Sequence, residues 1–190
     1  MEFGGSKTEQ NVLAAFAGES QARNRYTFFA SAARKEGYEQ IAAIFQQTSE
    51  EEKEHAKLFF KLLRGGSVGI SAAYPAGMIG TTKENLAAAE AGEEMEWGTL
   101  YPKFAATAER EGFSDIAELF KMVATVEARH RQRYGKLREN MENGTVFKEE
   151  TPVKWYCRNC GFVHEGKSAP AKCPVCGHPK AYFERAAENY

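Results

Sequence analysis

The sequence has no long hydrophobic run, no excess of one charge, and little proline or cysteine. No apolar stretch approaches the roughly 18 residues that a membrane-spanning helix needs, so we expect no membrane segment. The 25 Lys and Arg residues nearly balance the 26 Asp and Glu residues, and without a dominant basic field we expect no nucleic-acid binding. The first residues, Met1–Gly5, form neither a basic nor an apolar segment. We therefore expect no secretory signal and a cytoplasmic location.

Only one of the six prolines, Pro102, falls among the segments in which apolar residues recur at helical spacing. Residues 29–45 and 104–120 resemble each other at a shift of 75. Each copy reads as a helix, a glycine-centred turn and a second helix. We therefore expect four helices, over residues 8–36, 38–64, 82–111 and 113–143.

The segment 64–80, between the two copies, is rich in glycine and other helix breakers. The helix expected before it is about 40 Å long at about 1.5 Å per residue. Seventeen residues, at about 3.3 Å each when extended, can run back along that length. Two helix hairpins joined by one long crossover form a ferritin-like bundle. We expect this bundle over residues 1–146, a linker over 147–152 and a small separate module over 153–190.

All four cysteines lie in the small module, as the pairs Cys157/Cys160 and Cys173/Cys176 with twelve residues between the pairs. Two Cys-x-x-Cys pairs in a reducing compartment predict a tetrahedral metal site and not disulfides. A structural zinc ribbon and a four-thiolate iron centre both fit this spacing. A glycine follows each pair and lets backbone N–H groups turn back toward the thiolates, which slightly favours iron.

The second helix of each hairpin carries a Glu-x-x-His motif, at Glu52/His55 and at Glu127/His130. The spacing places a carboxylate and an imidazole on one face of each helix. A single such motif is usually a solvated helix face. These two, however, are related by the same shift of 75 as the repeat, which favours a shared metal site.

The first helix of each hairpin supplies one matching glutamate, Glu19 and Glu93, each preceded by Ala-Gly. One Glu from each of two helices and Glu-x-x-His from each of the other two is the ligand set of di-iron and di-manganese bundles. Carboxylates bridge two hard cations, and imidazole favours iron over magnesium. The sequence therefore predicts a carboxylate-bridged pair of metals.

The third helix contains one residue more than its counterpart. Tyr26 follows Glu19 by seven residues, whereas Tyr101 follows Glu93 by eight. An extra residue inside a continuous helix is usually absorbed as a π-bulge, and such bulges favour functional sites. We predict an i→i+5 turn in this interval that makes Tyr101 the counterpart of Tyr26.

The same interval supplies a fifth carboxylate, because Glu96 lies three residues after Glu93. Glu94 is an alternative ligand, although its repeat partner is a serine. An undistorted helix would turn Leu100, and not Tyr101, toward the site. Other residues have plainer interpretations: we expect core packing for Phe45, Trp97 and Phe120, and no metal ligation by His164 or His178.

Together, the two Glu-x-x-His motifs, the Glu93-x-x-Glu96 pair and the paired cysteines resemble the rubrerythrin family. The likeness covers nearly the whole chain, and the combination is far more specific than any one motif. It implies a mainly α fold, in which a ferritin-like bundle precedes a small rubredoxin-like β/loop domain. It implies di-iron ligands at Glu19, Glu52, His55, Glu93, Glu96, Glu127 and His130, and a four-cysteine iron at Cys157, Cys160, Cys173 and Cys176.

The resemblance also implies a function, a non-haem peroxidase that reduces hydrogen peroxide to water in oxidative-stress defence. One iron would move between His55 and Glu96 as its oxidation state changes. We expect these two residues to be catalytic, together with Tyr26 and Tyr101, whose hydroxyls can reach the carboxylates. The four-cysteine iron would relay electrons from an external donor, a rubredoxin or an NAD(P)H-linked reductase, within a homodimer. The alternatives are iron storage with ferroxidase activity, and a zinc-ribbon scaffold without catalysis.

Overall fold

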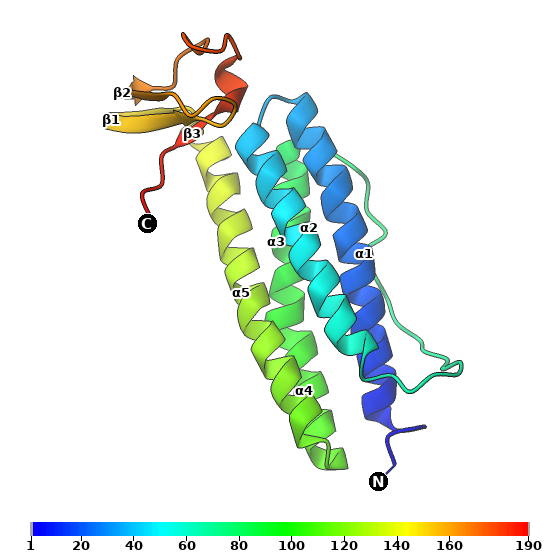
Figure 1. Cartoon of the computed structure of the whole chain (residues 1–190). Coiled ribbons are helices and arrows are strands. Elements are labelled where there is room, and N and C mark those ends of the chain that lie inside the picture. Colours follow the sequence, from blue (N-terminus) through cyan, green and yellow to red (C-terminus); the bar gives the residue numbers. More distant parts are fainter. Residues whose placement is uncertain (1, 190) are drawn as a thin grey trace.

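A computed structural model describes residues 2–189 of the chain. The first part is an elongated helical bundle, and a small β module follows at one end (Figure 1). The helical elements are α1 (Lys7–Lys35), α2 (Glu39–Phe60), α3 (Thr82–Met95), the π-helix η1 (Glu96–Leu100), α4 (Tyr101–Glu111) and α5 (Ser114–Glu142). The β module consists of β1 (Lys148–Cys157), β2 (Val163–Ser168), the short 3₁₀ helix η2 (Lys180–Tyr182) and β3 (Phe183–Arg185).

The bundle is made of two antiparallel hairpins, as the repeat predicts. Helix α1 packs along α2, while α3 and α4 pack along α5. Both hairpins turn at a glycine in the left-handed region, Gly37 with φ 84° and Gly112 with φ 86°, where a residue with a Cβ would be strained. The predicted helix bounds lie within one residue of the structure except at the end of α2.

The crossover begins earlier than expected. We predicted that the second helix would reach residue 64, but α2 ends at Phe60. The N–H groups of Leu62 and Leu63 bond to the carbonyls three residues before them, so the last turn tightens before the glycine-rich segment. The chain then runs back along the bundle without regular structure (Figure 1). The capping box predicted at Thr81 and Glu84 starts α3.

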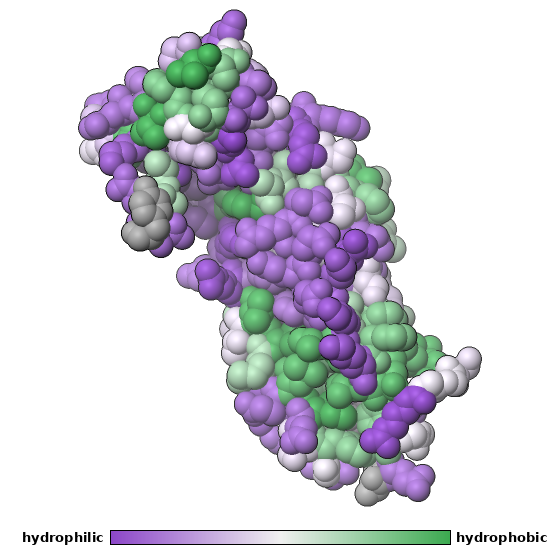
Figure 2. All heavy atoms as spheres, in the orientation of Figure 1, coloured by the Kyte–Doolittle hydropathy of each residue, from purple (hydrophilic) through white to green (hydrophobic). Residues whose placement is uncertain are grey.

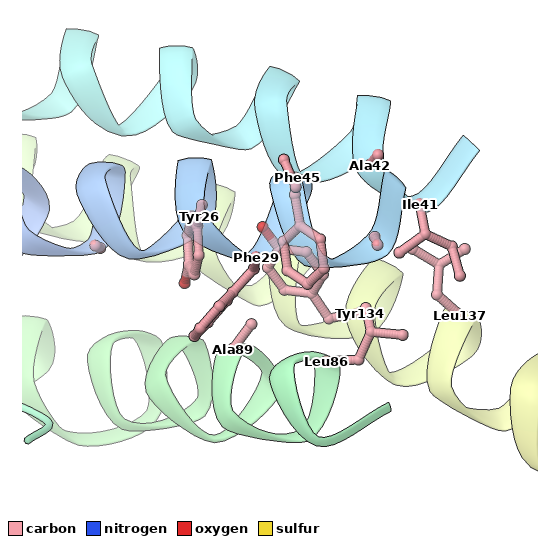
Figure 3. Packing of buried hydrophobic residues seen from close by; sticks show 12 residues of the cluster. Tyr26, Phe29, Ile41, Ala42, Phe45, Leu86, Ala89, Tyr134 and Leu137 are labelled. Carbon is pink, nitrogen blue, oxygen red and sulfur yellow. The ribbon is translucent and has the colours of Figure 1, made fainter. Parts of the chain in front are cut away.

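Two aromatic cores fill the bundle on either side of a central polar layer. The core toward the β module packs Tyr26, Phe29, Phe45 and Tyr134 among aliphatic residues (Figure 3). The core toward the other end contains the second set of repeat-related aromatics, Phe59, Tyr101, Phe104 and Phe120. Phe45 and Phe120 are fully buried, as predicted. The cores hold all four helices in register, so side chains of the layer between them face one another.

The β module is a three-stranded antiparallel sheet in the order β2-β1-β3. Residues 148–152, which we expected to be a linker, instead begin β1, and a bulge between Lys148 and Val153 lets the strand bend. Tyr38 at the α1–α2 turn stacks on Phe147 with ring centroids 5.9 Å apart. The module therefore rests on the end of the bundle. No helix within residues 2–189 is long and apolar enough to cross a membrane.

Candidate metal centres

Six buried side chains converge in the polar layer between the two cores. They form two overlapping groups, in each of which one ligand atom per residue lies within 4.8 Å of the others. The two groups share a pair of carboxylates, which is the arrangement that bridging requires. One group is Glu19, Glu52, His55 and Glu127, and the other is Glu52, Glu93, Glu127 and His130.

The two imidazoles enter the layer with the same ring atom. Nδ1 of His55 lies 3.0 Å from a carboxylate oxygen of Glu52 and 3.0 Å from one of Glu127. Nδ1 of His130 lies 2.8 Å from Glu127 and 3.2 Å from Glu52. The ring centroids are 6.0 Å apart. The shift of 75 in the sequence thus becomes an approximate twofold relation in space.

The electrostatics of this layer are those of a site that needs cations. Burial, then the charge of Glu127, raises the pKa of Glu19 well above its ordinary value. Burial and the charge of Glu52 raise the pKa of Glu93 to about 8. Burial would also raise the pKa of Glu52, but the adjacent imidazoles of His130 and His55 outweigh it and lower the pKa to about 2. Buried carboxylates this close repel one another unless protons or metals neutralise them.

Unpartnered atoms point to the same conclusion. Within residues 2–189, buried oxygens of Glu19, Glu52, Glu93 and Glu127, and Nδ1 of His130, have no hydrogen-bond partner. Buried polar atoms are normally hydrogen-bonded, so such a cluster calls for an ion. The four carboxylates of the two groups balance the charge of two divalent cations. The residues therefore fit a dinuclear metal centre.

Each terminal carboxylate is held by a buried tyrosine from the opposite hairpin. The hydroxyl of Tyr26 donates to Oε1 of Glu93 at 2.5 Å, and the hydroxyl of Tyr101 donates to Oε1 of Glu19. Both tyrosines are fully buried. The side chains that the sequence placed near the site therefore orient its carboxylates.

The predicted π turn is present and explains how Tyr101 reaches Glu19. The N–H of Tyr101 bonds to the carbonyl of Glu96, five residues before it. Tyr101 is buried in this geometry, while Leu100 is only half-buried at the edge of the core. One widened turn has absorbed the extra residue, and the following helix keeps the repeat register.

Glu96 lies beside the metal groups but belongs to neither of them. Its carboxyl points toward α1, since Oε1 of Glu96 lies beside Gly18, the residue before Glu19. Burial, then the charges of Glu19 and Glu93, raises the pKa of Glu96 well above the ordinary value. The alternative ligand Glu94 lies on the outside, where it pairs with Arg131 at 2.8 Å. Our prediction that Trp97 packs in the core is wrong, because the widened turn bulges outward and leaves Trp97 38% exposed.

Sequence reasoning missed a set of polar residues around His130. Nε2 of His130 lies 3.0 Å from Oε2 of Glu51, and the same oxygen accepts a hydrogen bond from Arg133 at 3.1 Å. Gln47 donates to the other oxygen of Glu51 at 2.8 Å. Arg133 also donates to Thr48 at 2.5 Å. The signal available in the sequence was a departure from the repeat, since Val126 is the counterpart of Glu51.

A pocket of about 520 Å³ opens between α2 and α5 directly above both histidines. His55 and His130 form its floor, and charged residues form its rim. This face of the molecule carries a hydrophilic band across its middle (Figure 2). The pocket is therefore a polar approach from solvent to the dinuclear centre.

The second centre is formed by the four cysteines of the β module. Their sulfurs lie 3.8 Å apart in the pair Cys157/Cys176 and 3.6 Å apart in the pair Cys160/Cys173. These distances exclude disulfides, whose sulfurs are about 2.05 Å apart. A metal about 2.3 Å from each of four tetrahedral sulfurs places them about 3.8 Å apart. The cysteines thus fit a four-thiolate metal.

The turns after the cysteine pairs shape this centre. Gly161 with φ 79° and Gly177 with φ 75° are left-handed, so the next N–H groups turn toward the sulfurs. A hydrogen bond from the N–H of His178 lowers the pKa of Cys176 to about 6. The imidazole of His178 packs against Tyr182 at 4.5 Å. Among the described residues, neither His178 nor His164 belongs to the candidate metal groups.

The fold and the two centres together define a ferritin-like metalloprotein with an attached four-cysteine domain. A family model described as Rubrerythrin matches residues 10–138, and one described as Rubrerythrin, rubredoxin-like domain matches residues 155–184. The rubrerythrin of Porphyromonas gingivalis is 59% identical over 98% of this chain and 93% of its own length. The rubrerythrin of Nitratidesulfovibrio vulgaris is 50% identical over 98% and 97%.

Solved structures agree with these relatives. Nigerythrin in a partially reduced state is similar with a TM-score of 0.61 and 31% identity, over 96% of this chain and 90% of that one. The bacterioferritin of Desulfovibrio desulfuricans, at 17% identity and a TM-score of 0.55, shares the fold. The chain belongs to the rubrerythrin family. Its cofactors are accordingly a carboxylate-bridged di-iron site in the bundle and one iron in the four-cysteine site.

Proposed function

We propose that this protein is a hydrogen peroxide reductase that uses its di-iron site to form water, in defence against oxidative stress. The observation that carries the proposal is the presence of two kinds of metal centre in one chain. A dinuclear site that only bound or oxidised iron would need no attached one-electron centre, whereas repeated reduction of peroxide needs a supply of electrons. When bound, the iron pair would supply Lewis acidity and one electron from each metal for cleaving the O–O bond.

We assign the ligands as the sequence predicts. Glu52 and Glu127, which occur in both groups, would bridge the metals. Glu19 and His55 would complete one position, and Glu93 and His130 the other. The fifth glutamate, Glu96, faces the layer from the π turn and would serve as an alternative ligand to His55. The four-thiolate ligands would be Cys157, Cys160, Cys173 and Cys176.

Protein groups around the di-iron site have separate tasks in this proposal. The hydroxyls of Tyr26 and Tyr101 hold Glu93 and Glu19 in orientation, and each places a proton next to a carboxylate of the site. Burial and neighbouring carboxylates raise the pKa of both tyrosines well above the ordinary value, so both remain protonated donors. Peroxide, a small polar molecule, would approach through the pocket between α2 and α5. The aromatic cores exclude water from the other sides.

Electron supply within a single chain faces a problem of distance. The β module rests on the α1–α2 turn, and His55 lies sixteen residues beyond the start of α2 at Glu39. At about 1.5 Å per residue, the di-iron layer lies about 24 Å along α2 from the end of the bundle on which the β module rests. Electron transfer slows steeply with distance, so we propose a homodimer in which one chain's four-cysteine iron lies near its partner's di-iron site. An external rubredoxin or NAD(P)H-linked reductase would reduce the four-cysteine iron.

A mixed dimer tests transfer between chains. Cys157→Ser removes the relay and Glu127→Gln impairs the di-iron site, so each homodimer should turn over poorly. Unfolding and refolding the two variants together should restore turnover toward that expected for mixed dimers. Mixtures that remain as inactive as their parents would contradict transfer between chains. Sedimentation of the wild-type protein provides the control for dimer formation.

We extend the proposal to organisation and location. The functional units would be the helical bundle and the four-cysteine domain, which begins with β1 at Lys148. A cytoplasmic location suits four free cysteines, because thiols stay reduced there.

The test of the proposed function combines metal analysis with kinetics. Protein isolated without added metal should contain three irons per chain, two in the bundle and one on the thiolates, and the ferric thiolate should colour it. Reduced protein should consume hydrogen peroxide and oxidise a supplied donor with two electrons used for each peroxide, that is, two molecules of a one-electron donor such as a rubredoxin. A colourless zinc protein would favour the scaffold alternative. Rapid Fe²⁺ oxidation with retained ferric mineral and no donor oxidation would favour iron storage.

A further inference from the structure

The polar residues around His130 have no polar counterparts around His55. The repeat relates the two histidines by a shift of 75, and both present Nδ1 to the shared carboxylates. Their outer nitrogens differ. Nε2 of His130 meets Glu51 at 3.0 Å, whereas Nε2 of His55 has no hydrogen-bond partner among residues 2–189.

The difference extends to every member of the network. Each polar residue of this hydrogen-bonded network around Glu51 corresponds, at the shift of 75, to an apolar residue in the other hairpin. The pairs are Glu51 and Val126, Gln47 and Met122, Thr48 and Val123, and Arg133 and Leu58. In all four pairs the polar residue lies near His130 and the apolar residue near His55, so the network departs consistently from the twofold relation. The face over α2 and α5 is accordingly hydrophilic across its middle and more hydrophobic toward the α4 end (Figure 2).

The network immobilises Glu51 before it meets His130. One oxygen accepts from Gln47 at 2.8 Å and the other from Arg133 at 3.1 Å, so the carboxylate has little freedom left. A carboxylate that accepts from the outer N–H of a histidine fixes the tautomer and the ring orientation. Here it leaves the lone pair of Nδ1 directed at Glu127 and Glu52, where a metal would bind.

We propose that Glu51 is a positioning residue for His130, and that the absence of its counterpart at Val126 makes the His130 position the tighter of the two metal positions. The proposal rests on the di-metal ligand set assigned above and not on peroxidase activity. The two metal positions therefore differ in affinity. The imidazole of His130 is held in its binding orientation before metal arrives, whereas the imidazole of His55 becomes ordered only when its metal binds. Outer partners of ligating histidines typically contribute 10- to 100-fold in metal affinity.

The test is a titration of metal-free protein with Co²⁺, monitored by absorption and calorimetry. The cobalt–thiolate bands of the cysteine site report that centre separately and provide an internal reference. Wild-type protein should bind two Co²⁺ in the bundle in distinguishable steps. Glu51→Val should weaken the tighter step about 10- to 100-fold and leave the cysteine site unchanged. Glu51→Gln retains an oxygen that accepts from Nε2 and should restore most of the loss.

Glu54→Val is the matched control, because Glu54 lines the same pocket but pairs with Lys57 at 3.0 Å and not with a histidine. It should leave both steps unchanged. Far-UV circular dichroism of each metal-free variant shows whether the bundle is folded. Equal weakening of both steps by Glu51→Val, or the same effect from Glu54→Val, would overturn the proposal. Wild-type protein that binds Co²⁺ only on its thiolates would overturn the di-metal site itself.

Discussion

Tyr101 shows how one hydroxyl in the core serves the metal site. It is fully buried, and its hydroxyl donates to Glu19, whose carboxyl is also fully buried. Removing a donor from a buried polar partner leaves that partner unsatisfied, which costs about 1–3 kcal/mol. The repeat supplies a second case at Tyr26 and Glu93. The carboxylates of this site therefore depend on neighbours that never need to touch a metal.

We predict that Tyr101→Phe lowers the free energy of unfolding of the metal-free protein by about 1–3 kcal/mol. Phenylalanine keeps the packing against Phe59 and Phe120, so the loss reflects the hydroxyl. Urea unfolding followed by circular dichroism measures it. Tyr156→Phe, at a 37% exposed position in the β module, should change stability little. Equal losses in the two variants would contradict this account of Tyr101.

At the level of elements, the N-terminus of α1 is capped by a carboxylate from another helix. Glu111, the last residue of α4, accepts hydrogen bonds from the N–H groups of Lys7 and Thr8 at 3.1 and 2.8 Å. These N–H groups lie in the first turn of a helix and have no partner within it. The hydrogen bond from the Thr8 hydroxyl is the main factor that lowers the pKa of Glu111 below its ordinary value. The contact joins the ends of the two hairpins.

Glu111→Ala should therefore destabilise the protein by about 1 kcal/mol near neutral pH, as loss of a helix cap does. Because folding lowers the pKa of Glu111, its stabilisation is complete above the unfolded-state pKa and disappears as pH falls through the lower folded-state pKa. The gap between wild type and variant should close in that acidic range. Unfolding curves at several pH values measure it. Glu118→Ala, at an exposed position on α5, should show no such gap at any pH.

The role of the π turn can be tested by deleting one of its residues. Gly98 lies within η1 and is exposed, and glycine inside a helix costs about 1 kcal/mol relative to alanine. Deleting it would place the tyrosine seven residues after Glu93, as Tyr26 follows Glu19. We expect the variant to fold with stability unchanged or raised by about 1 kcal/mol, and to lose peroxidase turnover because Glu96 is no longer held in the widened turn.

Thermal unfolding and peroxide consumption separate the two effects of that deletion. Gly98→Ala is the control, since it keeps the residue count and hence the turn. A deletion variant that unfolds more easily than wild type would show that the π turn serves stability and not the site.

At the level of the whole molecule, the division of labour between the two metal centres can be tested directly. Cys157→Ser removes a buried ligand of the four-cysteine site. Turnover with an external donor should stop, whereas a chemically reduced di-iron site should still be oxidised once by peroxide. Stopped-flow absorption follows both reactions. Ser168→Ala, a substitution in the same domain but outside the cysteines, should leave turnover intact. Loss of the single oxidation in the cysteine variant would mean that the domain does more than relay electrons.

Local spacing was enough to predict the elements and most of the centre. The Glu-x-x-His motifs lie on helix faces whatever surrounds them, because 3.6 residues per turn brings positions i and i+3 together. The cysteine pairs lie on short turns for a similarly local reason. Even the π turn followed from counting, since seven and eight residues cannot both be whole turns of an undistorted helix.

Tertiary structure decided what local spacing cannot. Trp97 has a large apolar side chain of the kind usually found in a core, but the outward bulge of its turn leaves it exposed. The network of Glu51 and Arg133 joins α2 to α5, and residues 82 positions apart meet only when the helices pack. Periodicity assigns a residue to a face of its own helix, whereas its partner depends on the rotation and depth of the neighbouring helix. The sequence by itself therefore determined the fold class and predicted the side chains that meet in the two candidate centres, and packing decided which of the two histidines contacts a second carboxylate through its outer nitrogen.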